Sequence, residues 1–414
     1  MLLFLVSAAH AFCGTFVGSD GALLANRASQ VVLARVSHYV TLTLAVDYTG
    51  DASEFALLMP VPSVLTAENV STVDPALLER VADWSSPREV AYTCDDLVTA
   101  DVEYGGCSTP LATGCAAEYS LGGGIGDDGE DAEGTVTVEA SFSEAGYEFV
   151  VLSTQTAGAL QTWLDDNGYA LPAGGDAILQ EYIDAGVYFL AAKVALDAAP
   201  TGQAWLPPIQ LTYESDTLSL PIRIGTISAD GPQEVLIYVL HEGGAVAISN
   251  YPEVAVDDEC LRSMDQDFGT YYADALDDAL GGEAGWIEEY SWSLTANCDP
   301  CTATTGLTPA ELEALGFAGY HGWFTRLRMR YSPEQATQDL AMYDGGDTGT
   351  PSQIRYIQDA PELRDFYPVC GEGVVPGDGT CIEVERSAPF GCAAAGAPVA
   401  AAMVLLSALL RRRR

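Results

Sequence analysis

Short runs of alternating hydrophobic and polar residues, separated by turn-forming residues, recur along much of the chain. Residues 30–48 (QVVLARVSHYVTLTLAVDY) read as two β-rich runs, and residues 54–62 (EFALLMPVP) as an apolar strand that ends at its prolines. Residues 134–142 and 146–154 predict a β-hairpin. The pattern predicts further strands within residues 187–196, 205–225 (two strands joined by a turn near Ser215 and Asp216), 233–240 and 285–294.

Five segments have the periodicity of short helices. Asp74 and Thr308 each precede a proline at the start of such a segment, where a side-chain oxygen can cap the helix. Another segment places Leu160, Trp163 and Leu164 on one inward face. Four of the predicted helices lie at residues 74–86, 156–172, 268–280 and 307–315. The fifth directly follows a predicted strand that begins at residue 323.

Strands and helices are mixed, without strict βαβ alternation and without a repeat. The pattern predicts an α+β fold, in which a largely antiparallel β-sheet body with several short helices precedes a C-terminal transmembrane helix. The glycine-rich acidic stretch at 122–134 predicts a flexible loop, which is either an insertion or a boundary between two lobes. We therefore expect a signal peptide at 1–11, an acidic extracytoplasmic body at 12–385 and a sorting or transmembrane tail at 386–414.

Composition narrows the class of protein. The 414 residues are 48% hydrophobic, which argues against global disorder despite a formal net charge of −42. Lys193 is the only lysine. Such a body repels phosphate backbones, so we expect no nucleic-acid partner. Solvation of the surface in salty water explains the acidic side chains better than a dedicated cation store.

Both ends have the pattern of export signals. The start, MLLFLVSAAHAFCG, predicts a secretory signal peptide that is cut after Ala11. Residues 393–410 are uncharged and would be about 27 Å long as a helix, against a hydrocarbon core of about 30 Å. A basic cluster follows directly and would hold the end of the chain on the cytoplasmic side, which places the body outside. The cluster is Arg411, Arg412, Arg413 and Arg414.

The layout of a cysteine, an apolar segment and an arginine cluster resembles the Myxo-CTERM tail, a C-terminal sorting signal of myxobacterial surface proteins. The resemblance implies processing at Gly391 and Cys392 and an anchor at the outer surface. It also implies two kinds of partner, which are the membrane, reached through the tail, and the export and sorting machinery.

Several distinctive phrases occur along the body, and they are FCGTF, FALLMPVP, LQTWLDDNGY, LTYESDTLSLPIRIG, NCDPC and TRLRMRYSPEQATQDL, which extend to about Tyr343. They resemble an uncharacterised bacterial secreted family known only as a domain of unknown function. The resemblance implies an exported envelope protein. It implies no catalytic residue in this chain.

The chain has ten cysteines. Because its two ends have the pattern of export signals, we expect these cysteines to form disulfides and not to be cytosolic thiols. We expect Cys370 to pair with Cys381, because a glycine-rich turn separates them. The spacing leaves the other pairings open. The disulfide candidates are Cys94, Cys107, Cys115, Cys260, Cys298, Cys301, Cys370 and Cys381.

Two short motifs resemble redox or metal sites. Cys298 and Cys301, in CDPC, have the spacing of such a pair, but a loop follows where a thioredoxin-type site needs a helix, and no second pair completes a zinc site. A structural disulfide is therefore favoured over redox chemistry. His241 begins HEGG, which resembles half of a zinc protease motif, but Ala245 stands where the second histidine belongs.

Charged side chains offer two further candidate sites. Arg326, Arg328 and Arg330 alternate in a predicted strand, so their guanidinium groups point to one face. Pairing with carboxylates of neighbouring strands is favoured over a site for a carboxylate or a sulfated sugar. Acidic residues with the oxygen ligands that calcium prefers cluster further upstream, although EF-hand spacing is absent and a solvated acidic face is the alternative. These candidates are Asp257, Asp258, Glu259, Asp265 and Asp267.

No catalytic constellation stands out, so the sequence assigns no catalytic and no cofactor-binding residue, and calcium is the one cofactor it leaves open. The first hypothesis is an uncharacterised protein of the cell envelope or cell surface, exported and membrane-anchored, with a non-enzymatic binding or structural role. A secreted hydrolase acting through paired carboxylates is the alternative. A CxxC redox protein is the weaker third hypothesis. The sequence does not identify the ligand.

Overall fold

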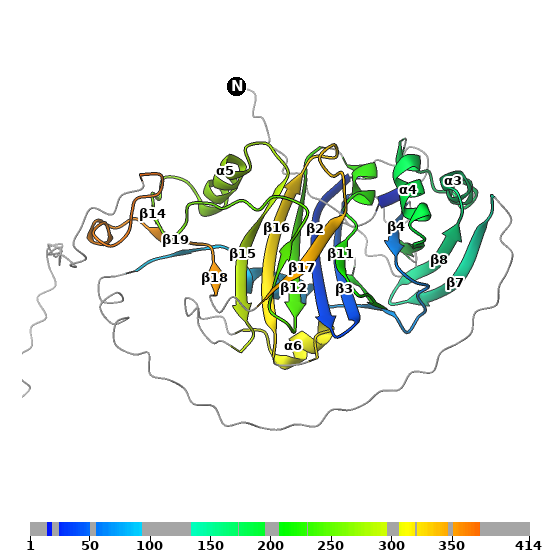
Figure 1. Cartoon of the computed structure of the whole chain (residues 1–414), viewed down its shortest axis with the longest axis horizontal. Helices are drawn as coiled ribbons and strands as arrows, with labels where there is room; N and C mark the ends of the chain where they lie inside the picture. Colours follow the sequence, from blue (N-terminus) through cyan, green and yellow to red (C-terminus); the bar gives the residue numbers. More distant parts are fainter. Residues whose placement is uncertain are drawn as a thin grey trace, which may run out of the picture.

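The computed structural model describes residues 15–18, 25–49, 55–92, 134–172, 174–194, 207–229, 231–295, 306–318, 321–346 and 351–372. These residues form four β-sheets with short helices packed against them (Figure 1). The structure is a sheet-rich α+β fold in which most strand pairs are antiparallel, as the sequence predicted. The described part of the chain holds no helix that is both long and apolar enough to span a membrane, and residues 393–410 lie outside it.

An eight-stranded sheet occupies the middle of the molecule (Figure 1). The two β-rich runs at its centre, β2 and β3, pair antiparallel, and β2 also pairs in parallel with β12. In spatial order the strands are β18 (Ser352–Gln353), β15 (Gly285–Ser293), β16 (Trp323–Tyr331), β12 (Gln233–His241), β2 (Ala25–Val36), β3 (Tyr39–Thr49), β10 (Ile209–Glu214) and β5 (Val70–Thr72).

A five-stranded sheet lies beside it, on the right in Figure 1. The predicted hairpin is present, because the last two strands pair antiparallel around a turn in which Ala145 and Gly146 both have positive φ. In spatial order the strands are β1 (Thr15–Gly18), β4 (Phe55–Val61), β9 (Tyr188–Val194), β8 (Tyr147–Thr154) and β7 (Val136–Glu144).

Two small sheets and two short 3-10 helices accompany the large sheets. The first sheet is antiparallel and has the order β11 (Leu218–Leu220), β17 (Leu340–Gly346) and β13 (Ala245–Ile248). The second is parallel and has the order β14 (Leu261–Arg262), β19 (Arg355–Gln358) and β6 (Arg88–Val90). The 3-10 helices are η3 (Ile224–Ser228) and η4 (Pro361–Leu363).

The main hydrophobic core lies between the eight-stranded and five-stranded sheets. Alternate residues of each strand face it, because successive side chains of a strand point to opposite sides. Leu33 and Ile237 of the larger sheet meet Phe149 and Leu190 of the smaller one, and all four are completely buried. The β11–β17–β13 sheet adds further apolar side chains, including Leu220, to the same core.

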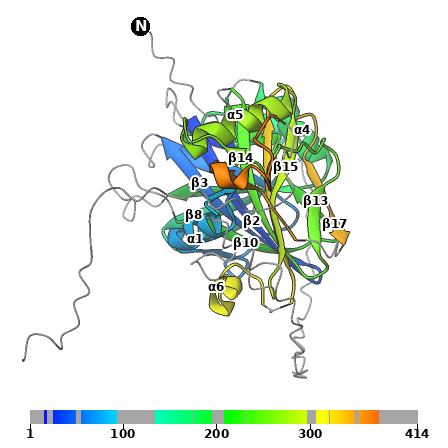
Figure 2. The same ribbon diagram turned by 90° about the vertical axis from the view of Figure 1, so that its left-hand side faces the viewer.

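Helices cover the remaining faces of both large sheets. α1 (Pro75–Ser85) and α6 (Pro309–Ala314) pack with the other face of the eight-stranded sheet, and α3 (Ala157–Asp166) and α4 (Gly175–Asp184) with the outer face of the five-stranded sheet. α5 (Phe268–Leu280) packs against residues of β15 and β19. Figure 2 shows α5 and α6 at opposite ends of the eight-stranded sheet.

Local sequence explains where these helices begin. Asp74 accepts a hydrogen bond from the backbone N–H of Ala76, at 3.0 Å, and Pro75 occupies the first turn of α1. Thr308 and Glu311 form a reciprocal capping box at the start of α6. Both predicted starts are therefore confirmed.

Two helix predictions need correction. The helix expected after β16 is wrong, because residues 332–339 form turns and β17 follows them. There, Leu340 and Met342 alternate into the main core, which is the two-residue period of a strand. The sequence also missed α4, whose first residues are Gly174 at the cap and Gly175 at the first helical position.

One disulfide joins distant described segments. Cys260 and Cys370 are bonded, so the expected pairing of Cys370 with Cys381 is wrong. Cys260 stands directly before β14, and the backbone N–H of Cys370 donates to the carbonyl of Leu261. The disulfide thus fixes residues near the end of the described chain to the small parallel sheet.

The turn after α6 brings a glycine unusually close to the eight-stranded sheet. Gly316 has a φ of +82°, and a Cβ atom there would lie 2.5 Å from side-chain atoms of Thr41 on β3. The left-handed conformation and the close approach both require glycine. Gly281, at the end of α5, has a φ of +59° but has open space around its missing Cβ.

We expect Gly316→Ala to lower the free energy of unfolding by about 2–4 kcal/mol, because left-handed strain and overpacking add. Gly281→Ala is the matched control and should cost only about 1–2 kcal/mol, from strain alone. Urea unfolding followed by circular dichroism measures both. Equal losses would contradict the close approach of α6 to β3.

Candidate functional site

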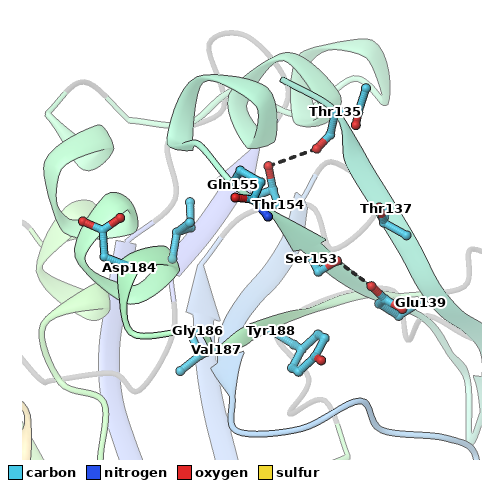
Figure 3. Close-up of a pocket in the computed structure, with 11 residues that line it drawn as sticks. Thr135, Thr137, Glu139, Ser153, Thr154, Gln155, Asp184, Gly186, Val187 and Tyr188 are labelled. Carbon is cyan, nitrogen blue, oxygen red and sulfur yellow. Dashed lines mark hydrogen bonds between the residues drawn. The ribbon is translucent and has the colours of Figure 1, made fainter. Parts of the chain in front are cut away.

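A groove with a volume of about 410 Å³ lies at the end of the five-stranded sheet (Figure 3). This volume falls within the range of small-molecule sites. One wall is β7, a second is the junction of β8 with α3, and a third is the connection from α4 to β9. Eleven residues line the groove, and they are Thr135, Thr137, Glu139, Ser153, Thr154, Gln155, Ile183, Asp184, Gly186, Val187 and Tyr188.

A β-bulge shapes the wall formed by β7. Thr137 lies opposite Ser153, but the pairing shifts between Val138 and Ala140, so Glu139 is the extra residue on this strand. Bulges re-aim side chains and recur next to functional sites. Here Glu139 accepts a hydrogen bond of 2.5 Å from the hydroxyl of Ser153 (Figure 3).

The end of α4 shapes the opposite wall. Gln180 donates a hydrogen bond of 2.8 Å to Asp184, the last residue of the helix. Gly186 then has a φ of +75°, and its backbone N–H donates to the carbonyl of Ile183. The glycine lets the chain leave the helix and enter β9, which places Tyr188 against the groove.

The groove offers hydrogen-bonding groups and little apolar surface. Its described lining carries hydroxyl groups on several side chains, one amide, and the carboxylates of Glu139 and Asp184. None of these eleven residues is a histidine, cysteine, lysine or arginine. The arrangement suits a polar ligand that is not an anion, because a buried or half-buried anion needs a positive partner.

The three arginines of β16 form a ladder with carboxylates of the flanking strands. Glu289 of β15 accepts from Nε of Arg326, at 2.5 Å, and from Nε of Arg328. Glu234 of β12 accepts from Arg328, at 2.6 Å, and from Arg330. Asp277 of α5 pairs with Arg330 at the exposed end. The predicted pairing with neighbouring strands is confirmed, and the arginines are engaged by the protein's own carboxylates.

Burial makes Glu289 the central member of this ladder. Its side chain is completely buried, and the hydroxyl of Tyr272 on α5 donates to it at 2.8 Å. Burial by itself would raise the pKa of Glu289, but the guanidinium groups of Arg328 and Arg326 outweigh it and lower the pKa to about 2. Glu289 is also the extra residue of a β-bulge in β15, which turns its carboxylate toward both arginines.

The calcium candidates do not meet at one point in the structure. Glu259 pairs with Arg355 at 2.6 Å, and Asp258 accepts from the backbone of the same arginine. Asp265 accepts from Ser263, and Asp267 caps α5. Asp257 accepts from the backbone N–H of Gly371. Over the described ranges, no group of three or more His, Cys, Asp or Glu side chains is placed to hold a metal ion, and calcium binding stays a prediction.

Several sequence candidates fall outside the residues that the structure describes. They are Ala11, Cys94, Cys107, Cys115, Cys298, Cys301, Cys381, Gly391, Cys392 and the arginines 411–414. His241 is described, at the end of β12. Its Nδ1 accepts from the backbone N–H of Gly243 at 3.0 Å and lies 3.8 Å from Asp344. Burial lowers the pKa of His241, so the ring favours its neutral form.

Sequence reasoning missed the groove because its residues come from three separate segments and are common types. The one available signal was the row of polar residues on the hairpin, where Thr135, Thr137 and Glu139 alternate. The row indicates a solvent-facing side of β7. It does not indicate that the end of α4 returns to the same place.

We expect Glu289→Gln to lower the free energy of unfolding by about 3–5 kcal/mol, because it leaves two buried guanidinium groups without their shared anion. Asp277→Asn, at the exposed end of the ladder, is the control and should cost at most about 1 kcal/mol. Denaturant unfolding measures both variants. Similar losses in the two would contradict a central role of Glu289.

The lowered pKa of Glu289 also predicts a pH dependence. The pKa in the folded protein, about 2, lies below the ordinary value, so the stabilisation is complete above about pH 5 and is lost as the pH falls toward 2. The free energy of unfolding of the wild type should therefore fall by about 3 kcal/mol more than that of Glu289→Gln between pH 5 and pH 2. If that variant does not fold, Tyr272→Phe should start its acid unfolding at a higher pH than wild type. Parallel pH profiles would refute the assignment.

Comparison with known protein families gives a match. The model of a family described as an uncharacterised protein conserved in bacteria, DUF2330, matches residues 7–343. No curated protein and no solved structure matches the chain. The matched region includes all the strands and helices that carry the groove and the arginine ladder, and it ends within β17. The chain therefore belongs to DUF2330, a family of uncharacterised proteins conserved in bacteria.

Proposed function

We propose that this chain is an exported protein of the bacterial cell envelope that binds a polar ligand in its groove and catalyses no reaction. The lining of the groove carries the proposal. Hydroxyl, amide and carboxylate groups from three elements converge there, while the eleven described lining residues include neither the histidine nor the cysteine of a nucleophilic site.

Export has support from a different part of the chain. The disulfide between Cys260 and Cys370 favours an oxidising compartment over the cytosol. The signal-like residues 1–11 and the apolar run at 393–410 with its arginines supply a route and an anchor. In this arrangement the body that carries the groove lies outside the cytoplasmic membrane.

Hydrolysis through paired carboxylates is the second candidate. Its support is that Glu139 and Asp184 line the same groove, and glycoside hydrolases use two such groups. Each carboxylate already accepts a hydrogen bond from a neighbour, Ser153 or Gln180, which suits binding as well as it suits catalysis. The binding function is preferred because it needs no further group.

Protease treatment of intact cells tests the location. We expect external protease to digest the body of the chain, and the intact mass of protein from the envelope to show loss of residues 1–11 and an oxidised Cys260–Cys370 pair. A chain truncated before Cys392 is the control and should be released from the membrane. Full-length protein in the cytosol with reduced thiols would refute export.

A further inference from the structure

We infer that the ligand of the groove is a neutral saccharide, held by hydroxyl and carboxylate groups and by the ring of Tyr188. The inference rests on the proposed binding function and names the class of its ligand. It follows from the charge, the polarity and the geometry of the lining.

Charge excludes anionic ligands. The described lining has two carboxylates and no basic side chain, and the whole chain carries a formal net charge of −42. A phosphate, sulfate or carboxylate group would enter without a positive partner and against the field of the protein. The arginines of β16 do not alter this conclusion, because the ladder engages them with Glu234, Glu289 and Asp277.

Polarity excludes predominantly apolar ligands. Small-molecule pockets are usually apolar with a few polar groups, whereas this groove has polar side chains on every wall. An apolar molecule would strip water from these groups without replacing their hydrogen bonds. The apolar contribution of the lining is limited to Ile183, Val187 and the half-buried ring of Tyr188.

A saccharide matches both kinds of surface. Its hydroxyl groups can donate to the oxygens of Ser153 and Thr154, whose own protons are directed to Glu139 and to the backbone carbonyl of Thr135, and its C–H faces can pack on an aromatic ring. The two carboxylates would accept from sugar hydroxyls in charge-assisted hydrogen bonds, which are stronger than neutral ones. Glu139 is best placed to do this, because the bulge and the hydrogen bond from Ser153 fix its orientation.

The test is binding of defined sugars to the processed protein recovered from the envelope, measured by isothermal titration calorimetry. The neutral probes are glucose, galactose, N-acetylglucosamine and their short oligomers, with glucuronate as the anionic probe and glucosamine as the cationic one. We expect at least one neutral probe to bind and glucuronate not to bind. Tighter binding of glucosamine than of every neutral probe would overturn the inference.

Variants locate the site. Glu139→Gln and Tyr188→Ala should each weaken binding of the neutral probe at least tenfold, because they remove the charge-assisted acceptor and the ring. Glu144→Gln, the same change on the same strand outside the groove, is the matched control and should leave affinity within twofold. Equal effects of Glu139→Gln and Glu144→Gln would overturn the inference. Melting temperatures establish that each variant is folded.

The outcomes separate the ligand class from the proposed function. Failure of all neutral probes, with saturable binding of the cationic probe that Glu139→Gln abolishes, would reject a neutral saccharide as the ligand and leave a binding protein. Release of new reducing ends from an oligomer would instead reject the non-enzymatic role while supporting the saccharide. A protein found only in the cytosol would reject the exported function whatever the groove binds.

Discussion

The alternating charges between β12, β16 and β15 are the constraint on which the rest of the structure depends. Arginines of the middle strand lie between carboxylates of its two neighbours, so three strands must align for the charges to meet. A shift by one residue would turn every side chain of a strand to the other face and would bury unpaired charges in the main core. A shift by two residues would keep the apolar side chains on the core face but would still separate the arginines from their carboxylates, so the charges distinguish registers that hydrophobic alternation leaves open.

The same ladder explains how a very acidic chain keeps a buried network. Its cations are few, and in the described part of the chain several of them pair with carboxylates of other elements. Arg262 pairs with Glu89 across the small parallel sheet, and Arg223 pairs with Glu181 of α4. These pairs place positive charge inside the fold or between elements. The outer surface therefore stays negative, and a groove on it meets its ligand without basic groups.

The sequence predicted the parts of the structure that depend on local pattern. α5 has its predicted bounds, the caps at Asp74 and Thr308 form, and the arginines of β16 pair with neighbouring strands. In each case the residues that decide the outcome are close in sequence or share a strand. The partners Glu234 and Glu289 were not predictable, because strand order and the bulge in β15 decide which carboxylates reach the arginines.

Features that depend on contacts between distant segments were missed or predicted wrongly, because no local pattern marks them. Cys260 and Cys370 are separated by 110 residues, so no spacing rule favours their pairing over the nearer Cys381. α4 was hidden because glycines at its cap and first position weaken the helical signal, although Leu179, Tyr182 and Ile183 are buried by the five-stranded sheet. The groove depends on that helix, so it was hidden with it.

The separation of the groove from the ladder has a functional consequence. The ladder belongs to the eight-stranded sheet, whereas the groove uses β7, the outermost described strand of the other sheet, and the end of α4. The main core between the sheets fixes β8 and β9, which carry Ser153 and Tyr188, so part of the groove is rigid before a ligand arrives. Apart from Glu139, whose orientation Ser153 fixes, residues on β7 and at the end of α4 are more exposed and can adjust to the ligand at small energetic cost. A rigid floor with adaptable walls permits changes of specificity at Glu139 or Asp184 without loss of the fold, because neither side chain takes part in the buried charge network.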